Sequence, residues 1–351
     1  MILRWLVAVL ALFQGGCATV DYYAQAVSGH FEVMGAARDM HSVIATTADA
    51  GLRTRLEQAL EARAFATSQL RLPDNDSYTQ YVDLQRPFVV WNIVATPELS
   101  LQPKTWCYLV VGCVAYRGYY EEASARSEAD ALKAAGFDVS VSGVRAYSTL
   151  GWFDDPLLNT MLAPPTPYLQ GVMFHELAHQ QLYADDDSAF NEAFATAVER
   201  EGIRRWLAEH GTTQERSRYD VAQQRRGEFT GLVERYRQVL LDIYANGEAD
   251  AAKRTGKADA FRRMRIEYAA MAMRWGVDAY RHYFDAGLNN ARLAAVATYL
   301  KWVPAFEALL RREAGNLERF YAAAARIAKL PFPDRRRALA QLCGENTCSK
   351  Y

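Results

Sequence analysis

The chain has little histidine or cysteine and almost no net charge. Only six of its 351 residues are histidines, five are cysteines, and the formal net charge is −1. Because there is no excess of basic residues, nothing favours the positive field that nucleic-acid binding needs, and we expect no nucleic-acid partner. Beyond its first residues the chain has no stretch long and apolar enough to cross a bilayer. Half of the residues are hydrophobic, which is enough for a substantial core.

Two of the few histidines stand four residues apart, in the run His175-Glu176-Leu177-Ala178-His179. On a helix the two imidazoles lie on one face and can share a metal ion. Apolar residues at helical spacing surround the run, and prolines precede it, which predicts such a helix. A chance H-E-x-x-H is expected on the order of 0.01 times in this composition. The alternative is an amphipathic helix with two solvated or core histidines.

A second acidic motif follows, because Asn191 to Ala195 read N-E-A-F-A. Glu192 is the leading candidate for a third metal ligand. Glu199 is the alternative, since it lies seven residues later and faces the same side of one helix. One of the two glutamates would bind the metal and the other would support the site from behind. Asp187 or Ser188 is expected to cap the helix that carries them.

The two motifs resemble the H-E-L-A-H-Q-W and N-E-G-F-A signatures of the gluzincin aminopeptidases. The whole chain also resembles a family of bacterial proteins described as predicted aminopeptidases. The resemblance implies a peptidase that holds one Zn²⁺ ion through His175, His179 and Glu192, with Glu176 as general base and a peptide as substrate. Mn²⁺ or Co²⁺ could occupy the same ligands. The G-x-M-E-N exopeptidase motif is absent, so an endopeptidase is the alternative within this class.

A peptidase also needs a group that stabilises the oxyanion, commonly a tyrosine, histidine or arginine. Tyr147 lies on the segment that leads to the H-E-x-x-H helix, and Arg292 and Tyr299 follow a polar cluster. We name Tyr147 and Tyr299 as catalytic candidates, the alternative for each being a tyrosine packed in the core. The aromatic run 116–120 could line a cleft or simply form a packed loop.

The start of the chain indicates export. Trp5 to Phe13 form an apolar run that is too short to span a bilayer, and Gly15-Gly16-Cys17 follow. This pattern resembles a bacterial lipoprotein signal over residues 1–16, with lipid attached to Cys17. Ala18 resembles the sorting residue of outer-membrane lipoproteins, which predicts an anchored protein facing the periplasm. The alternatives are an ordinary signal cut near Ala18 and a buried structural Cys17.

The other four cysteines form two local pairs, and we predict the disulfides Cys107–Cys113 and Cys343–Cys348. A second metal site is the alternative, although neither pair has C-x-x-C spacing, and the sequence leaves the other two connectivities open. The cell envelope also allows a different class of function. The chain could be a lipid-anchored binding or assembly factor that keeps zinc for structure only.

The periodicity predicts an α+β, mainly helical fold. We expect an N-terminal helical segment over residues 17–75, and a zincin-like catalytic domain over residues 76–351 with a C-terminal helical part. Helical segments would flank this zincin-like metallopeptidase core. Within it, we expect strands at 88–94 and 137–141 with a helix at 121–135 between them. The basic run at 335–337 is expected to be a solvated helix face.

Overall fold

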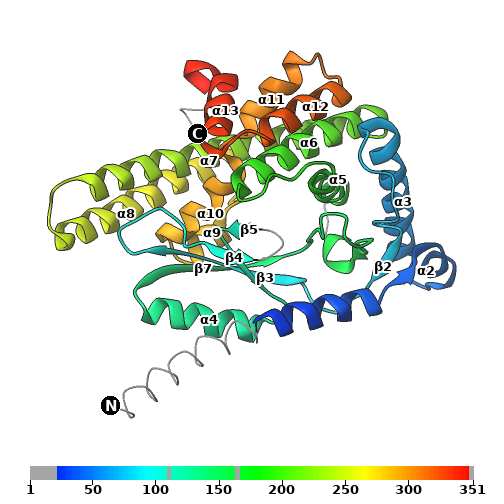
Figure 1. Ribbon diagram of the computed structural model, residues 1–351, viewed down its shortest axis with the longest axis horizontal. Coiled ribbons are helices and arrows are strands. Elements are labelled where there is room, and N and C mark those ends of the chain that lie inside the picture. Colours follow the sequence, from blue (N-terminus) through cyan, green and yellow to red (C-terminus); the bar gives the residue numbers. More distant parts are fainter. Residues whose placement is uncertain (1–21, 109–111, 163–166, 348–351) are drawn as a thin grey trace, which may run out of the picture.

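The computed structural model describes residues 22–108, 112–162 and 167–347, and these form a mainly helical α+β fold (Figure 1). The fold class is therefore confirmed, whereas the zincin-like core stays a prediction. The expected signal peptide and Cys17 lie outside the described residues.

The first described helix covers residues 22–35. The helices that follow it are α2 (Met40–Thr46), α3 (Ala50–Leu70), α4 (Glu122–Ala134), the 3-10 helix η1 (Asn159–Leu162), α5 (Tyr168–Gln181), α6 (Ser188–Glu209), α7 (Thr213–Ala245), α8 (Asp250–Trp275), α9 (Arg281–Asp285), α10 (Asn290–Leu300), α11 (Val303–Arg312), α12 (Leu317–Ala328) and α13 (Phe332–Thr347).

Three small sheets accompany the helices within the described residues. The largest has the antiparallel order β6-β3-β7. A second has the order β1-β2-β8, and β4 and β5 form a two-stranded hairpin. The strands are β1 (Arg38–Asp39), β2 (Gln80–Val82), β3 (Val90–Pro97), β4 (Trp106–Tyr108), β5 (Gly112–Val114), β6 (Arg117–Tyr119), β7 (Phe137–Val144) and β8 (Leu157–Leu158).

The β3–β7 pair carries the predicted strand–helix–strand pattern. The two strands pair from Val90 opposite Val144 to Pro97 opposite Phe137. Alternate residues of β3 pack into one cluster with the buried face of α4, because side chains of a strand alternate between faces. The three expected elements are confirmed, although β3 starts two residues later and runs further than expected. Gly136 ends α4 with a φ of +86°, a conformation that glycine adopts without strain.

Helices α5 and α6 lie at the centre of the main core. They approach so closely that a Cβ on Gly202 would come within 2.6 Å of Phe174 and 2.8 Å of Leu70. The N-terminal helices, α11 and α12 pack into this same core, so both central helices are enclosed (Figure 1). Such dense surroundings hold the side chains of α5 and α6 in fixed positions.

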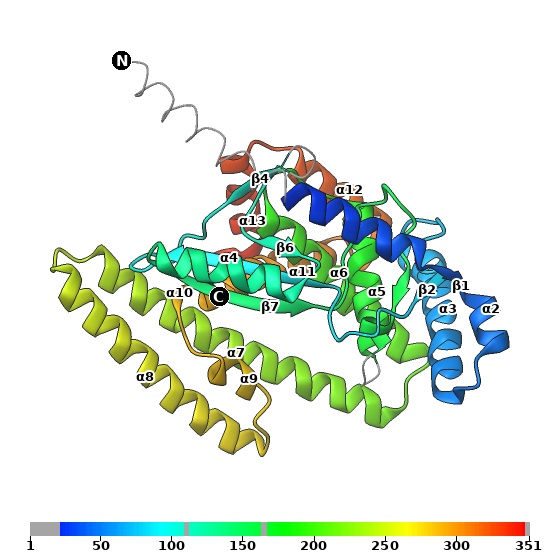
Figure 2. The same cartoon turned by 90° about the horizontal axis from the view of Figure 1, so that it is seen from below.

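Helices α7 and α8 form a long hairpin that extends to one side of the molecule (Figures 1 and 2). They pack on each other through a separate hydrophobic cluster that also includes α9. Within the described part of the chain, no helix combines the length and the apolar character that crossing a membrane requires.

The basic run on α13 corrects one expectation. Arg335 is buried rather than solvated, and its Nη1 lies 3.2 Å from the Asp187 carboxylate. Arg336 reaches the same carboxylate at 2.9 Å, whereas Arg337 stays exposed. A carboxylate distant in sequence therefore draws two of the three arginines inward. The expected Cys343–Cys348 bridge stays a prediction, because Cys348 lies outside the described residues.

Candidate metal centre

The two histidines of α5 and the first glutamate of α6 converge at one point. His175 Nε2 lies 3.3 Å from Glu192 Oε2, and His179 Nε2 lies 3.9 Å from the same oxygen. One ligand atom from each of the three residues lies within 4.8 Å of the others. The structure therefore brings together a group that could hold a metal ion.

This spacing fits a zinc ion. Tetrahedral zinc bound at about 2.0–2.1 Å separates its ligand atoms by about 3.4 Å, close to the distances at Glu192. Two imidazole nitrogens and one carboxylate oxygen are also typical ligands of catalytic zinc. All three side chains are largely withdrawn from solvent. The donor set and its geometry both suit the ion that the sequence predicts.

Glu199 lies behind the metal group. Its Oε2 is 3.2 Å from His175 Nδ1, the ring nitrogen opposite the one that faces Glu192. A carboxylate in this position accepts the Nδ1–H hydrogen bond and leaves Nε2 free for a metal. The geometry therefore favours Glu192 as ligand and Glu199 as the support of His175, which is one of the arrangements that the sequence allows.

The electrostatics of the group suit a cation. Burial disfavours a charge on His175, but hydrogen bonds to Glu192 and Glu199 outweigh it and raise the pKa of His175 well above its usual value. Burial lowers the pKa of His179 to about 4, so this imidazole is neutral at physiological pH. A proton on His175 therefore offsets part of the negative charge of the two carboxylates, at the position where a divalent ion would offset more of it.

The short connector between α5 and α6 is held by two side chains. Asn191 accepts from the Ala184 amide at 2.7 Å and donates to the Ala184 carbonyl at 2.9 Å. Asp187 caps α6 by accepting from the Phe190 amide, as expected, and also binds the arginines of α13. Only twelve residues separate His179 from Glu192. These bonds let so short a connector place Glu192 in the first turns of α6.

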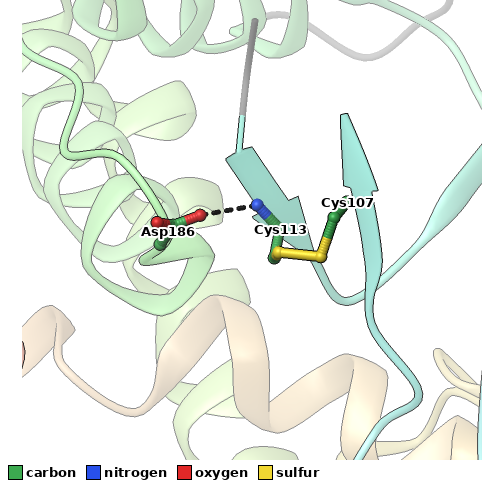
Figure 3. Close-up of a disulfide and its surroundings, with 3 residues drawn as sticks. All are labelled: Cys107, Cys113 and Asp186. Atoms are coloured by element: carbon green, nitrogen blue, oxygen red, sulfur yellow. Dashed lines mark hydrogen bonds between the residues drawn. A yellow bond between two sulfur atoms is a disulfide. The ribbon is translucent and has the colours of Figure 1, made fainter. Parts of the chain in front are cut away.

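A disulfide hairpin braces this connector from the other side. The predicted Cys107–Cys113 bridge is present between β4 and β5. The Cys113 amide donates to Asp186 Oδ1 at 2.6 Å, as Figure 3 shows. Gly112 has a φ of +68°, and a Cβ there would overlap the Asp186 carboxylate. Glycine is therefore required here both for its backbone conformation and for the close contact.

Glu176 faces a cavity of about 470 Å³ that also exposes the three candidate metal ligands. Burial, followed by the neighbouring carboxylates, raises the pKa of Glu176 to about 7 although His175 opposes the shift. A carboxyl group with a pKa near neutrality can both accept and return a proton. Its position beside the metal group, rather than within it, is what a general base needs.

Tyrosines dominate the cavity wall. Among the described residues that line it, none is a lysine or an arginine. Val90, Val144 and Leu150 add apolar surface to this wall. The seven tyrosines of the lining are Tyr22, Tyr23, Tyr108, Tyr116, Tyr120, Tyr147 and Tyr183.

The structure describes the side chain of one catalytic candidate, Tyr147, but not that of the other, Tyr299. Tyr147 lines the cavity, and its hydroxyl lies 3.2 Å from His30 Nδ1. Burial raises the pKa of Tyr147 and also that of Tyr116. The Glu192 carboxylate raises the pKa of Tyr116 further. Tyr299 belongs to α10, but its side chain lies outside the described part. Both catalytic tyrosines therefore stay predictions, and Tyr116 joins them as a candidate.

Two parts of the site were not predicted from the sequence. The helix over residues 22–35 contributes Tyr22 and Tyr23 to the cavity, although it lies about 150 residues before the metal motif. Gln180, directly after the H-E-x-x-H run, donates to Asp155 Oδ2 at 3.2 Å and so ties α5 to the loop before β8. Arg292 donates to the Gly287 carbonyl and is not among the described lining residues.

Comparison with known proteins agrees with the motif. The model of a family described as "Putative aminopeptidase" matches residues 21–339. No curated protein and no solved structure matches the chain. Since the family model spans most of the chain, including both motifs and the cavity wall, the protein belongs to the putative aminopeptidase family.

Proposed function

We propose that the protein is a zinc-dependent aminopeptidase of the cell envelope that acts on short peptides. The proposal depends on one observation, which is that His175, His179 and Glu192 converge beside Glu176. One ligand atom from each of the three lies within 4.8 Å of the others. Family membership supports the same reaction class.

The residues divide into distinct roles. His175, His179 and Glu192 hold the ion, and Glu199 orients His175 through Nδ1. When bound, zinc lowers the pKa of water and polarises a carbonyl group. Glu176 takes the proton of the attacking water and returns it to the leaving amine. Three protein ligands leave a coordination position free for the reaction, unlike the four ligands of a structural zinc site.

The cavity favours a neutral, bulky substrate residue. Its lining is mostly aromatic and aliphatic, and such walls bind apolar side chains. Because the described lining holds no lysine or arginine, neither of these side chains would pair there with a substrate carboxylate. The negative faces of the tyrosine rings could instead attract the α-ammonium group of a peptide. Both features suit the N-terminal end of a peptide better than its C-terminal end.

The proposed location is the periplasmic side of the outer membrane, with lipid on Cys17 as the anchor. The small residues before Cys17 and the apolar run before them support this location. The Cys107–Cys113 disulfide also suits an oxidising compartment.

A peptide pool tests the function. Half of the pool is N-acetylated, and the products of the wild type and of Glu176→Gln are read by mass spectrometry. We expect only the wild type to remove single N-terminal residues, and only from free peptides, while both proteins keep equal zinc. Internal cleavage of both halves would make the protein an endopeptidase. Undiminished turnover by Glu176→Gln would exclude this glutamate as the base, and no cleavage by the wild type would favour the binding-factor alternative.

A further inference from the structure

An exposed apolar patch lies on the helix over residues 22–35 and on the loop beside it. Phe31 is 59% exposed, and Trp152 is 73% exposed. Phe31 and Phe153 are in ring contact at 6.5 Å, which joins helix and loop into one surface. Tyr23 and Val27 extend the stripe along the helix at i, i+4 spacing. The apolar patch, as we define it, consists of Tyr23, Val27, Phe31, Trp152 and Phe153.

The patch does not resemble a solvated helix face. Of the seven exposed positions in residues 22–35, only Glu32 carries a charge. Helix α4 lies on the same side of the molecule, as Figure 2 shows, and four of its eight exposed positions are charged. A helix that faces water normally carries charged residues on its outer face. Contiguous exposed apolar surface instead indicates contact with another apolar phase.

The position of the chain start identifies that phase. Four residues separate Cys17 from Tyr22. A chain segment spans at most about 3.3–3.6 Å per residue, so a lipid-bearing Cys17 lies within ~18 Å of the first turn of the helix. Phe31 lies about 14 Å further along the helix axis. An anchor at Cys17 would therefore hold this face, rather than the α7–α8 hairpin, against the bilayer.

We infer that the apolar patch docks on the surface of a lipid bilayer with neutral headgroups. Tryptophan, tyrosine and phenylalanine are the side chains that interfacial binding uses, and the single charge on this helix face gives no attraction to anionic lipid. The inference rests on the proposed anchor for its orientation, but not on the peptidase activity.

Docking would also bring the cavity to the membrane surface. The helix that carries Val27 and Phe31 lines the cavity with Tyr22, Tyr23 and Ala26, so Tyr23 belongs both to the patch and to the cavity wall. The loop that carries Trp152 lines it with Ser148 and Leu150. The two elements that would enter the bilayer interface therefore form one edge of the cavity, and peptides held at the membrane surface would reach the site directly.

Fluorescence quenching tests the docking. The mature protein, isolated with its own N-terminus, is reconstituted in phosphatidylcholine vesicles with or without bromine on the acyl chains. The difference in emission between wild type and Trp152→Phe isolates the contribution of Trp152. Because an interfacial side chain enters the acyl boundary by about 5–10 Å, brominated lipid should remove most of this contribution. Phe31→Ser should restore much of it, whereas Ile266→Ser, which alters a residue that is 61% exposed on α8, should not.

Each outcome decides the inference. Equal Trp152 emission in both kinds of vesicle would overturn it, as would quenching that Phe31→Ser leaves unchanged. Self-association that the patch substitutions abolish, seen by sedimentation without vesicles, would show that a second copy covers the patch. The intact mass reports the lipid on Cys17, and quenching without that lipid would still support docking. Turnover of a soluble peptide in the same samples reports the proposed function separately.

Discussion

Replacing Glu199 should weaken zinc binding without removing a ligand. Its carboxylate lies 3.2 Å from His175 Nδ1 and 4.0 Å from the Arg226 guanidinium, and the side chain is 18% exposed. Glu199→Gln keeps an oxygen that can accept the Nδ1–H bond but removes the negative charge. Glu199→Ala removes both, so the imidazole loses its orientation as well.

The expected loss of zinc affinity follows from this difference between the two substitutions. Carboxylates that support a metal-binding histidine contribute about 10–100-fold to metal affinity, or about 1.4–2.7 kcal/mol. We place Glu199→Gln near the lower limit of this range and Glu199→Ala near the upper one. Glu192→Gln should weaken binding more than either, because it replaces a charged ligand atom by a neutral one.

Competition with a chromophoric chelator measures these affinities. Glu307→Gln is the matched control, because Glu307 pairs at 2.8 Å with Arg200, the neighbour of Glu199 on α6. This control should bind zinc like the wild type. An unchanged affinity in Glu199→Ala would refute the supporting role. Loss of zinc by Glu199→Gln with retention by Glu192→Gln would mean that the two glutamates have exchanged roles.

Three further predictions concern protonation and stability. Zinc binding has to displace the proton that the raised pKa keeps on His175. Affinity should therefore rise about tenfold per pH unit up to that pKa, and a plateau already reached at the usual histidine value would contradict this. Gly136→Ala should cost about 1 kcal/mol of unfolding free energy for its positive φ alone. Gly112→Ala should cost about 2–3 kcal/mol because it adds a steric overlap, and equal urea midpoints for the two variants would disprove that contact. Asp187→Ala should cost about 3–5 kcal/mol by leaving a buried guanidinium unpaired, which the same urea titration measures.

Local patterns made the metal group predictable. The spacing of His175 and His179 on one helix, and of Glu192 and Glu199 on the next, defines which side chains share a face. The strand–helix–strand around Gly136 was predictable for the same reason, since each element carries its own periodicity and stop signal. The Cys107–Cys113 disulfide likewise joins residues only six apart in sequence.

Contacts between distant segments were not predictable in this way. Arg335 pairs with a carboxylate 148 residues away, and no local feature distinguishes this arginine from the exposed Arg337. Tyr22 reaches the cavity because the first helix crosses its edge, which depends on the packing of the whole core. The same packing leaves Phe31 exposed, although its spacing from Val27 would equally suit a buried face.

The N-E-A-F-A motif shows how a single ligand depends on its neighbours. Asn191 uses its side chain on both backbone groups of Ala184, so it holds the connector rather than the metal. Phe194 is fully buried and stacks on Phe320 at 5.7 Å, while both alanines of the motif are also fully buried in the core. Only Glu192 turns towards the histidines. Four of the five residues therefore fix the position of one carboxylate. For this reason, a glutamate within the whole motif predicts a metal ligand more strongly than a lone glutamate at the same distance from the histidines would.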